Sequence, residues 1–230
     1  MKDYIKYIIH KYYPLDNHNT FIHVGKCAGS TLEKILMSKL KISRTYHMRK
    51  PIFNRKSNYY IVLRNPISRA ISAFNWRKRL VLQEKTQINR FQYEYDTLKK
   101  YKSLNQIAEL LYDSNQTNSN KLLEFERIHH IKKGINYYLS FLIKKNRLKY
   151  LKKVFVQETL NEDIKSFFDI NMDNRKKYKE NKVETKLSNK AIQNLIKYYS
   201  DDYYCIFKLH QYGLLSLKQF RLLIKIPFEK

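Results

Sequence analysis

Glycine and proline are scarce in this chain of 230 residues, which contains four of each. These two residue types interrupt regular elements and form most tight turns. Their scarcity favours a helix-rich protein with little loop. No internal repeat is visible in the sequence.

Cysteine is scarcer still, since only Cys27 and Cys205 are present. Two cysteines do not suggest a disulfide framework, and a reducing compartment is the simpler expectation. The chain also lacks the roughly 20 consecutive apolar residues that a membrane-spanning helix needs. The apolar stretch near the N-terminus is interrupted by Lys6 and is too short for a signal peptide. These absences predict a soluble, cytoplasmic protein.

Acidic residues are few: Asp and Glu number 20 against 46 Lys and Arg, for a formal net charge of +26. Such a chain is attracted to polyanions, including nucleic acid, anionic lipid, nucleotide phosphates and acidic glycans. Lys, Asn, Ile and Tyr are abundant together, as expected of a genome rich in A and T. Because codon bias alone can place many lysines on solvated faces, only basic residues inside a motif carry a functional argument.

Apolar sequence is sufficient for one folded domain, since 43% of the residues are hydrophobic. We expect a single domain over residues 1–230, or one domain with a small helical annex. Strands that alternate with helices predict an α/β fold with a parallel sheet covered on both faces. The expected strands are 20–24, 59–63 and 153–157, the expected helices are 32–37, 67–78, 99–112, 135–149 and 187–199, and the polar stretch 113–120 is expected to be a linker or loop.

The first functional motif is the segment 21–32, Phe-Ile-His-Val-Gly-Lys-Cys-Ala-Gly-Ser-Thr-Leu. A loop between a buried strand and a helix N-terminus directs backbone N–H groups and the helix dipole at one point. Gly25 and Gly29 let the backbone approach a ligand closely, and Lys26 adds a full positive charge. The segment differs from the triphosphate loop Gly-x-x-x-x-Gly-Lys-Ser/Thr, because Lys26 precedes the second glycine. We predict a phosphate-binding loop, with an ordinary strand-to-helix turn as the alternative.

The second motif is the segment 59–74, in which a strand ends at Arg64-Asn65-Pro66 and a helix follows. In triphosphate hydrolases a second strand usually ends in an Asp that holds Mg²⁺. A cation at that position would repel a metal ion and attract a phosphate. Ligands bind at the carboxyl ends of parallel strands, so we expect Arg64 beside the loop that carries Lys26. Ser72, two helical turns later, can face the same pocket. The alternative for Arg64 is a surface ion pair that caps the strand.

Together, the two motifs resemble those of the sulfotransferase superfamily that uses 3′-phosphoadenosine-5′-phosphosulfate (PAPS), in particular its carbohydrate-type members from the Golgi and from bacteria. The family's 5′-phosphosulfate loop typically reads Phe-Ile-His-x-x-Lys-Thr-Gly-Gly-Thr-Thr-Leu. Its 3′-phosphate motif typically reads Arg-Asp/Asn-Pro-x-x-Arg-x-x-Ser-x-Tyr/Phe. Weaker similarity continues through 130–139, 154–163 and 197–207, so it covers about 20–207 and leaves 208–230 as a basic amphipathic tail. The resemblance implies a three-layer P-loop-like fold, with a central parallel sheet flanked by helices and a helix-rich C-terminal part.

The resemblance also implies roles for individual residues. The 5′-phosphosulfate would be held by Lys26, Cys27, Ala28, Gly29, Ser30 and Thr31, and the 3′-phosphate by Arg64 and Ser72. Cys27 stands where the family usually has Thr, which removes one hydroxyl, and Ala28 replaces a Gly. The implied reaction moves a sulfuryl group from PAPS to a hydroxyl of a glycan or glycolipid, by in-line displacement and without a metal. Lys26 would meet the charge that develops on the leaving phosphate.

A base should accept the proton of the acceptor hydroxyl, and His47 is the candidate because the ordinary pKa of histidine is near 6.5. It lies between the first predicted helix and the second predicted strand, an interval in which relatives often have a catalytic His or Glu. Glu33 is the alternative base, and His47 can equally be a surface residue. His23, in a buried strand, is expected to be structural.

The acceptor is expected to contact the segment that resembles the family's acceptor cleft, through His130, Lys133 and Tyr137. Trp76 and many tyrosines offer flat surfaces for sugar rings, and the nearby basic residues suit an anionic glycan: Arg44, Arg49, Lys50, Arg55, Arg77, Lys78 and Arg79. The tail 216–230 can lie on an anionic membrane surface or pack as a terminal helix.

Two other functions stay open. One is a nucleotide kinase-like enzyme on a P-loop fold, against which the position of Lys26 and the presence of Arg64 count. The other is a basic nucleic-acid-binding protein, which would predict a steep salt dependence of binding but leaves the two ordered motifs unexplained. The expected partners are therefore a nucleotide donor and a glycan acceptor, without a specific nucleic acid. Peripheral contact with an anionic membrane remains an option, and the sequence makes no prediction of oligomeric state.

Overall fold

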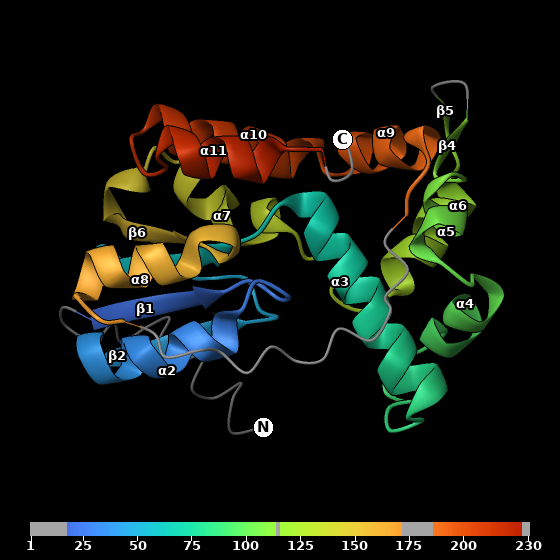
Figure 1. Ribbon diagram of the computed structural model, residues 1–230, viewed down its shortest axis with the longest axis horizontal. Coiled ribbons are helices and arrows are strands. Elements are labelled where there is room, and N and C mark those ends of the chain that lie inside the picture. Colours follow the sequence, from blue (N-terminus) through green and yellow to red (C-terminus); the bar gives the residue numbers. More distant parts are fainter. Residues whose placement is uncertain (1–17, 114–115, 172–185, 227–230) are drawn as a thin grey trace.

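The computed structural model describes residues 18–113, 116–171 and 186–226 (Figure 1). Its centre is a four-stranded parallel sheet with the strand order β2-β1-β3-β6. The predicted α/β class, with a parallel sheet flanked by helices, is confirmed. The strands are β1 (His18–His23), β2 (Ile42–His47), β3 (Ser57–Leu63) and β6 (Leu151–Val156).

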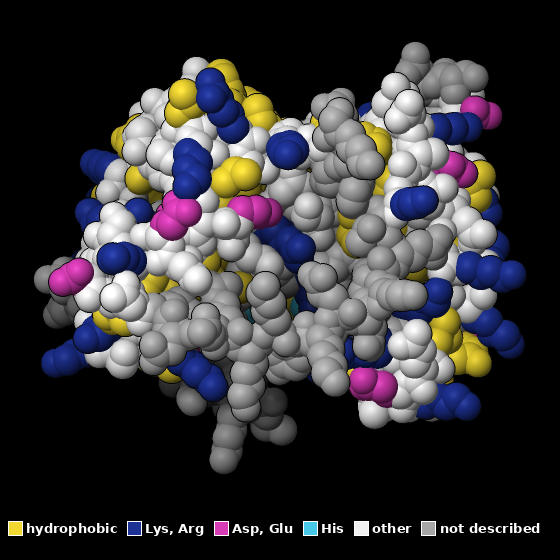
Figure 2. Space-filling view, in the orientation of Figure 1, with side chains coloured by type: hydrophobic (Ala, Val, Ile, Leu, Met, Phe, Trp, Pro, Cys, Tyr) yellow, Lys and Arg dark blue, Asp and Glu magenta, His cyan; other side chains and the backbone are white. Residues whose placement is uncertain are grey.

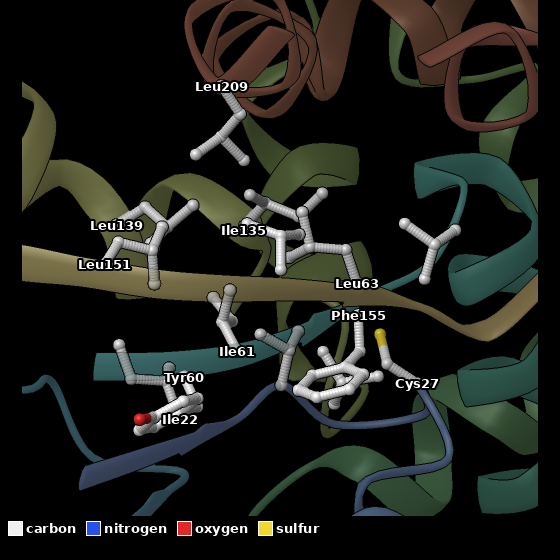
Figure 3. Packing of buried hydrophobic residues seen from close by; sticks show 14 of the residues in the cluster. Ile22, Cys27, Tyr60, Ile61, Leu63, Ile135, Leu139, Leu151, Phe155 and Leu209 are labelled. Atoms are coloured by element: carbon white, nitrogen blue, oxygen red, sulfur yellow. The ribbon is translucent and has the colours of Figure 1, made fainter. Parts of the chain in front are cut away.

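Helices cover both faces of the sheet, which explains why most residues of β1, β3 and β6 are buried. On one face, Phe167 of α8 contacts the rings of Tyr60 and Phe155. On the other, Phe141 of α7 contacts the ring of Tyr59. Figure 3 shows the packing of this core, which we call the sheet lobe. Its helices are α2 (Gly29–Leu40), α7 (Ile135–Ile143), α8 (Leu160–Phe168), α10 (Ser200–Gln211) and α11 (Leu217–Ile224).

A second hydrophobic core lies in a group of short helices beside the sheet, which we call the helical lobe (Figure 1). Its fully buried members include Phe74, Ile107 and Phe125, from three different helices. The helices are α3 (Pro66–Lys78), α4 (Glu94–Lys100), α5 (Leu104–Ala108), α6 (Ser119–Arg127) and α9 (Asn189–Tyr198), and a π-helical turn (Arg79–Gln83) extends α3. The remaining elements are the hairpin strands β4 (Tyr112–Asp113) and β5 (Gln116–Thr117) and two 3₁₀ turns (Leu148–Tyr150 and Gln157–Thr159).

Several expected elements differ from the structure. The helix expected over 99–112 is wrong: Tyr101 is extended, and Ser103 caps a new helix by accepting a hydrogen bond from the N–H of Gln106. The helix expected over 135–149 ends at Ile143. Strand β2 was not expected, because four of its six residues are polar and it lies at an edge of the sheet. Of the polar stretch 113–120, residues 114–115 lie outside the described part, and the rest forms the hairpin and the start of α6.

The segment after residue 207 is not an appended tail. Leu209, Leu215 and Leu223 are buried in the core of the sheet lobe. The last helix, α11, therefore packs on the domain, as one of the two expectations for this segment stated. Residues 227–230 of the chain, like the apolar stretch at the N-terminus, lie outside the described residues. Within the described parts of the chain, no helix is both long and apolar enough to cross a membrane.

The order in which strands are added to the sheet reverses at β1, which has β2 on one side and β3 on the other. The chain runs from β1 outward to β2 and then crosses back to β3. In open parallel sheets, ligands bind at the carboxyl ends of the strands where the order reverses in this way. Lys26 follows β1 and Arg64 follows β3, so the topology brings the two predicted motifs to this point.

Candidate functional site

The loop after β1 has a strained backbone that presents N–H groups. Lys26 and Ala28 have φ angles of 69° and 60°, in the left-handed region that residues other than glycine rarely adopt. Loops of this kind turn successive N–H groups toward one side. The N–H of Thr31 donates to the carbonyl of Ala28 at 3.2 Å, whereas the N–H groups of Gly29 and Ser30 have no acceptor among the described residues. Ser30 and Thr31 are exposed, whereas Gly29 is buried, so the N–H of Ser30 and the hydroxyls of Ser30 and Thr31 are available to an anion at the start of α2.

Two histidine rings pack directly against the glycines of this loop. A Cβ atom at Gly25 would lie 2.4 Å from Nδ1 of His130, and one at Gly29 would lie 1.9 Å from Cδ2 of His23. Glycine is required at both positions because no side chain fits there. The loop is therefore in contact with residue 130, which is more than 100 positions later in the chain.

The thiol of Cys27 does not face the ligand side of the loop. Its side chain is fully buried in the core of the sheet lobe (Figure 3), and Sγ donates to the carbonyl of Gly25 at 3.6 Å. Burial raises the pKa of this thiol to about 12. For the role that the resemblance implies, only the backbone N–H of Cys27 is available.

Lys26 and Arg64 lie side by side between the two lobes. Nη1 of Arg64 donates to the carbonyl of Lys26 at 3.4 Å, and both side chains are partly buried. Burial, together with the charges of Arg64 and Arg79, lowers the pKa of Lys26 to about 8. The ion pairs of the described residues include neither Lys26 nor Arg64. The carboxylate of Glu158 is near enough to oppose the lowering of the pKa of Arg64 by burial, but it is engaged with the N–H of Asn65 at 3.1 Å. The two partly desolvated cations are thus in no direct ion pair among the described residues, an arrangement that an anion would stabilise.

One face of α3 forms the floor beneath Lys26. Nζ of Lys26 lies 4.1 Å from the ring centroid of Trp76, and Arg79 lies 4.4 Å from the same centroid. Ser72 precedes Trp76 by four positions, so the two side chains share this face of the helix. Ser72 is therefore on the side of α3 that faces the loop. Trp76 is covered by two cations and does not offer both faces to a sugar ring.

His47 is exposed at the end of β2, and its ring centroid lies 4.2 Å from that of His23. Nδ1 of His47 lies 3.1 Å from the carbonyl oxygen of His23. A carbonyl can only accept, so in the neutral ring Nδ1 carries the proton and Nε2 keeps its lone pair. His47 thus has a free basic nitrogen. His23 is buried and paired with Glu33 at 3.6 Å, and burial, with His47 nearby, lowers the pKa of His23 to about 4 despite this carboxylate. The burial of His23 agrees with a structural role. Glu33, the alternative base, is engaged in the same pair.

His130, whose ring packs against Gly25 of the loop, forms the next part of the site. Its ring centroid lies 6.0 Å from that of His47, and burial, followed by the charges of His129 and Lys26, lowers its pKa to about 2. Its backbone has a φ angle of 75° and is held by the fully buried Arg69, which donates to the carbonyls of His130 at 2.7 Å and Ile131 at 3.1 Å. Arg69 thus connects α3 to the turn that carries His130.

A buried ion pair also stabilises the turn that carries His129 and His130. Arg77 donates to both carboxylate oxygens of Glu94, at 2.9 and 2.7 Å, and the N–H of His129 donates to Glu94 at 2.7 Å. The ring of His129 stacks on Phe91 at 3.9 Å. Arg77, which was expected to face an acceptor, is instead 2% exposed and fully engaged in the helical lobe.

A cavity of about 200 Å³ opens beside this turn, next to His47. Met48, the neighbour of His47, lines it, and its backbone is fixed by Tyr138, which accepts from its N–H, and by Lys133, which donates to its carbonyl at 2.6 Å. Nζ of Lys133 also lies 5.5 Å from the ring of Tyr137. The lining residues are Met48, Phe91, Glu126, Arg127, Ile128, His129, His130, Lys132 and Lys133. Of the three predicted acceptor contacts, His130 and Lys133 line the cavity and Tyr137 lies behind Lys133.

The structure therefore brings most of the predicted residues into one site between the lobes. A chain of contacts runs from Lys26 and Arg64 through the loop to His130 and His47. Sequence reasoning missed Arg69 and Glu94, the residues that hold the turn. Arg69 carried a signal, because it is the second arginine of the Arg-Asn-Pro-x-x-Arg segment, whereas nothing marked Glu94. Among the described residues, no group of three or more His, Cys, Asp or Glu side chains could hold a metal ion.

Comparison of the chain with family models, with curated proteins and with solved structures gave no significant match. The function must therefore be argued from the site itself and from the sequence motifs that form it.

Proposed function

We propose that this protein transfers a sulfuryl group from PAPS to a hydroxyl of a carbohydrate, on a P-loop-like version of the α/β fold. One observation carries the proposal. Lys26 and Arg64 follow two adjacent parallel strands, lie in contact and are partly buried, and the ion pairs of the described residues include neither of them. A nucleotide with phosphate-type groups at both its 5′ and 3′ positions offers one anion to each cation.

The residues of the loop fit the 5′ end of such a donor. The free N–H group of Ser30 and the exposed hydroxyls of Ser30 and Thr31 can bind equatorial oxygens at the N-terminus of α2. Arg64, with Ser72 on the facing side of α3, is assigned to the 3′-phosphate. Arginine suits this role because its planar fork can donate two parallel hydrogen bonds to phosphate.

Lys26 is the candidate for stabilising the leaving group. With a pKa of about 8, roughly nine-tenths of Lys26 is protonated at pH 7. A preorganised cation in a partly desolvated site stabilises developing charge more than it would in water. The left-handed backbone of the loop and the ring of Trp76 on α3 hold Lys26 in place.

His47 is the candidate base. Its Nε2 is free to accept a proton, because Nδ1 is engaged with the carbonyl of His23. The adjoining cavity is the candidate place for the acceptor. We expect His47→Ala to lower turnover on glycan acceptors while leaving nucleotide affinity unchanged. Wild-type turnover by that variant would remove His47 from the mechanism.

The donor is tested by calorimetric titration with adenosine 3′,5′-bisphosphate, the nucleotide product, in parallel with ADP and Mg-ATP. We expect metal-independent binding that requires the 3′-phosphate and is lost in Arg64→Ala. Arg55→Ala is the matched control: it removes the same charge from an exposed position just before β3, at the opposite end of that strand from Arg64. Binding without preference for the 3′-phosphate would overturn the proposal. Tighter binding of Mg-ATP would favour a kinase-like enzyme.

A further inference from the structure

The hairpin of α10 and α11 exposes an unusual amount of apolar surface. Half of the large apolar residues that are exposed in the described chain belong to this hairpin, which spans only residues 200–224. They are Tyr204 (52%), Phe207 (46%), Tyr212 (47%), Leu217 (52%) and Ile224 (40%). Scattered exposed apolar residues are normal, but a contiguous group indicates an interaction surface.

These residues converge because of how the two helices meet. His210 of α10 stacks on Phe220 of α11, with ring centroids 4.4 Å apart and an interplanar angle of 12°. Phe207 is one turn from His210 on the same side of α10, and Leu217 and Ile224 are one turn on either side of Phe220. The three exposed side chains therefore flank the line along which the helices touch. We call this surface the hairpin face.

Basic side chains border the hairpin face. Nζ of Lys208 lies 5.6 Å from the ring of Tyr204 and 6.0 Å from that of Phe207. Arg221 and Lys225, exposed on α11 and just after it, are in no ion pair among the described residues. Figure 2 shows hydrophobic and basic side chains intermingled over these two helices. Of the acidic groups at this hairpin, Glu162 is paired with Lys218 at 2.6 Å, Asp202 is buried, and the exposed Asp201 accepts from the side-chain amide of Asn136 at 3.0 Å.

We propose that the hairpin face docks on an anionic lipid membrane. Apolar side chains flanked by lysine and arginine are the composition of helices that lie in the plane of a membrane interface. A second copy of this chain is a poorer occupant: across a two-fold axis it would bring the basic border of one copy, with Lys208, Arg221 and Lys225, against the equally basic border of the other. Anionic headgroups supply the missing negative charge, and the acyl boundary accepts Phe207, Leu217 and Ile224.

Docking would place the candidate site close to the membrane. Nδ2 of Asn65, next to Arg64, donates to the carbonyls of Leu223 at 2.9 Å and Lys225 at 2.8 Å. The end of α11 is thus bonded directly to the strand end that carries Arg64. The docking proposal itself does not depend on the donor nucleotide, so either proposal can fail alone.

The test is co-sedimentation of the full chain with vesicles of phosphatidylcholine that contain phosphatidylglycerol, against vesicles of phosphatidylcholine alone. The patch variant carries Phe207→Ser, Leu217→Ser and Ile224→Ser. The matched control carries Met37→Ser, Leu110→Ser and Leu123→Ser, which are equally exposed but lie on other surfaces. Because the whole chain is strongly basic, the comparison is made at about 0.15 M salt, where long-range attraction is screened.

We expect the patch variant to bind the anionic vesicles about tenfold more weakly than wild type, and the control to bind within about twofold of it. Lys208→Glu combined with Lys225→Glu, which leaves the apolar residues in place, should also reduce binding. Equal vesicle binding by wild type and the patch variant would overturn the proposal. So would a concentration-dependent dimer in light scattering that the patch variant abolishes, since a second copy would then occupy the hairpin face.

Discussion

The two lobes position their halves of the site by different physical means. In the sheet lobe, Lys26 and Arg64 follow parallel strands whose backbone groups are satisfied by the ladder itself. In the helical lobe, His129 and His130 lie on an irregular turn, and its N–H and carbonyl groups are satisfied by charged side chains, Glu94 and Arg69. Where the backbone has no regular partner, buried ions take its place. The helical half should therefore be the more vulnerable to a single change of charge.

The largest effect is expected from Glu94→Gln. The variant leaves Arg77 buried and without its counter-charge, which typically costs about 3–5 kcal/mol in the free energy of unfolding. Urea denaturation measures the loss, and hydrogen exchange should show it concentrated in the helical lobe. The double variant Arg77→Met, Glu94→Met should recover part of it, because no unpaired charge remains. A loss below about 1 kcal/mol would mean that ordinary packing, and not the ion pair, holds this half together.

The second effect concerns Lys26 and alkaline pH. Its pKa is about 8 when folded and near 10.5 when unfolded, so across that window the unfolded chain binds more protons and the free energy of unfolding rises with pH. The contribution amounts to about 3 kcal/mol over the whole window. Urea denaturation at pH 8 and at pH 10.5 measures this rise. In Lys26→Met, the free energy of unfolding should rise by about 3 kcal/mol less than in wild type. Lys34→Met, on the exposed face of α2, is the control and should retain the rise.

A saturating concentration of adenosine 3′,5′-bisphosphate should reduce the wild-type rise, because a bound anion favours the charged lysine. A Lys26→Met curve parallel to that of wild type would show that this ammonium group is solvated in the folded protein.

A smaller effect is expected where the lobes meet, at Asn65. Its Oδ1 accepts from the N–H of Ser68 at 3.0 Å and caps α3, and its Nδ2 satisfies two carbonyls at the end of α11. Asn65→Ala should cost about 1–2 kcal/mol, the usual value for a lost cap. Asn65→Asp keeps the cap but not the donor, so it separates the two contributions. Equal stability of Asn65→Asp and wild type would show that the bonds to α11 add nothing.

The smallest effect is expected from Glu84→Gln. This variant breaks the exposed pair of Glu84 with Arg79 (3.2 Å) in the helical lobe, which also contains Glu94. Exposed pairs contribute about 0–1 kcal/mol, so the urea midpoint should hardly move. This variant has the same chemical change as Glu94→Gln, and the contrast between them measures what burial adds. Similar losses in both would contradict the comparison between the lobes.

Most of the sheet lobe could be predicted from the sequence. Strands β1, β3 and β6 each contain a short apolar run, the longest being 59–63 in β3, and Pro66 marks the start of α3 at its first position. Strand β2 was missed, because an edge strand with three consecutive polar residues, 43–45, gives a weak signal. The helical lobe was predicted less well: the Tyr101 to Ser103 break between α4 and α5 contains neither Gly nor Pro, so only the cap by Ser103 ends the helical pattern.

For the site, the two motifs predicted which residues lie at the strand ends, but not what holds the helical half of the site. Lys26 and Arg64 belong to motifs with a recognisable order. Glu94 and His129 are 35 positions apart, and nothing local relates them. Their bond depends on tertiary packing, which periodicity and composition do not describe. The burial of Cys27 was likewise invisible, since a loop residue was expected to face its ligand.

The bonds of Asn65 also bear on the order of events during synthesis. Its amide partners lie 158 and 160 positions later in the chain. At a translation rate of about 5–20 residues per second, Asn65 precedes them by roughly 8–32 s. During this interval β1 and β3 can already exist, but the strand end that carries Arg64 lacks its tie to α11. The strand end that carries Arg64 is therefore among the last parts of the molecule to acquire its final geometry, because its tie to α11 cannot form until residues 223–225 have been made and are free to fold.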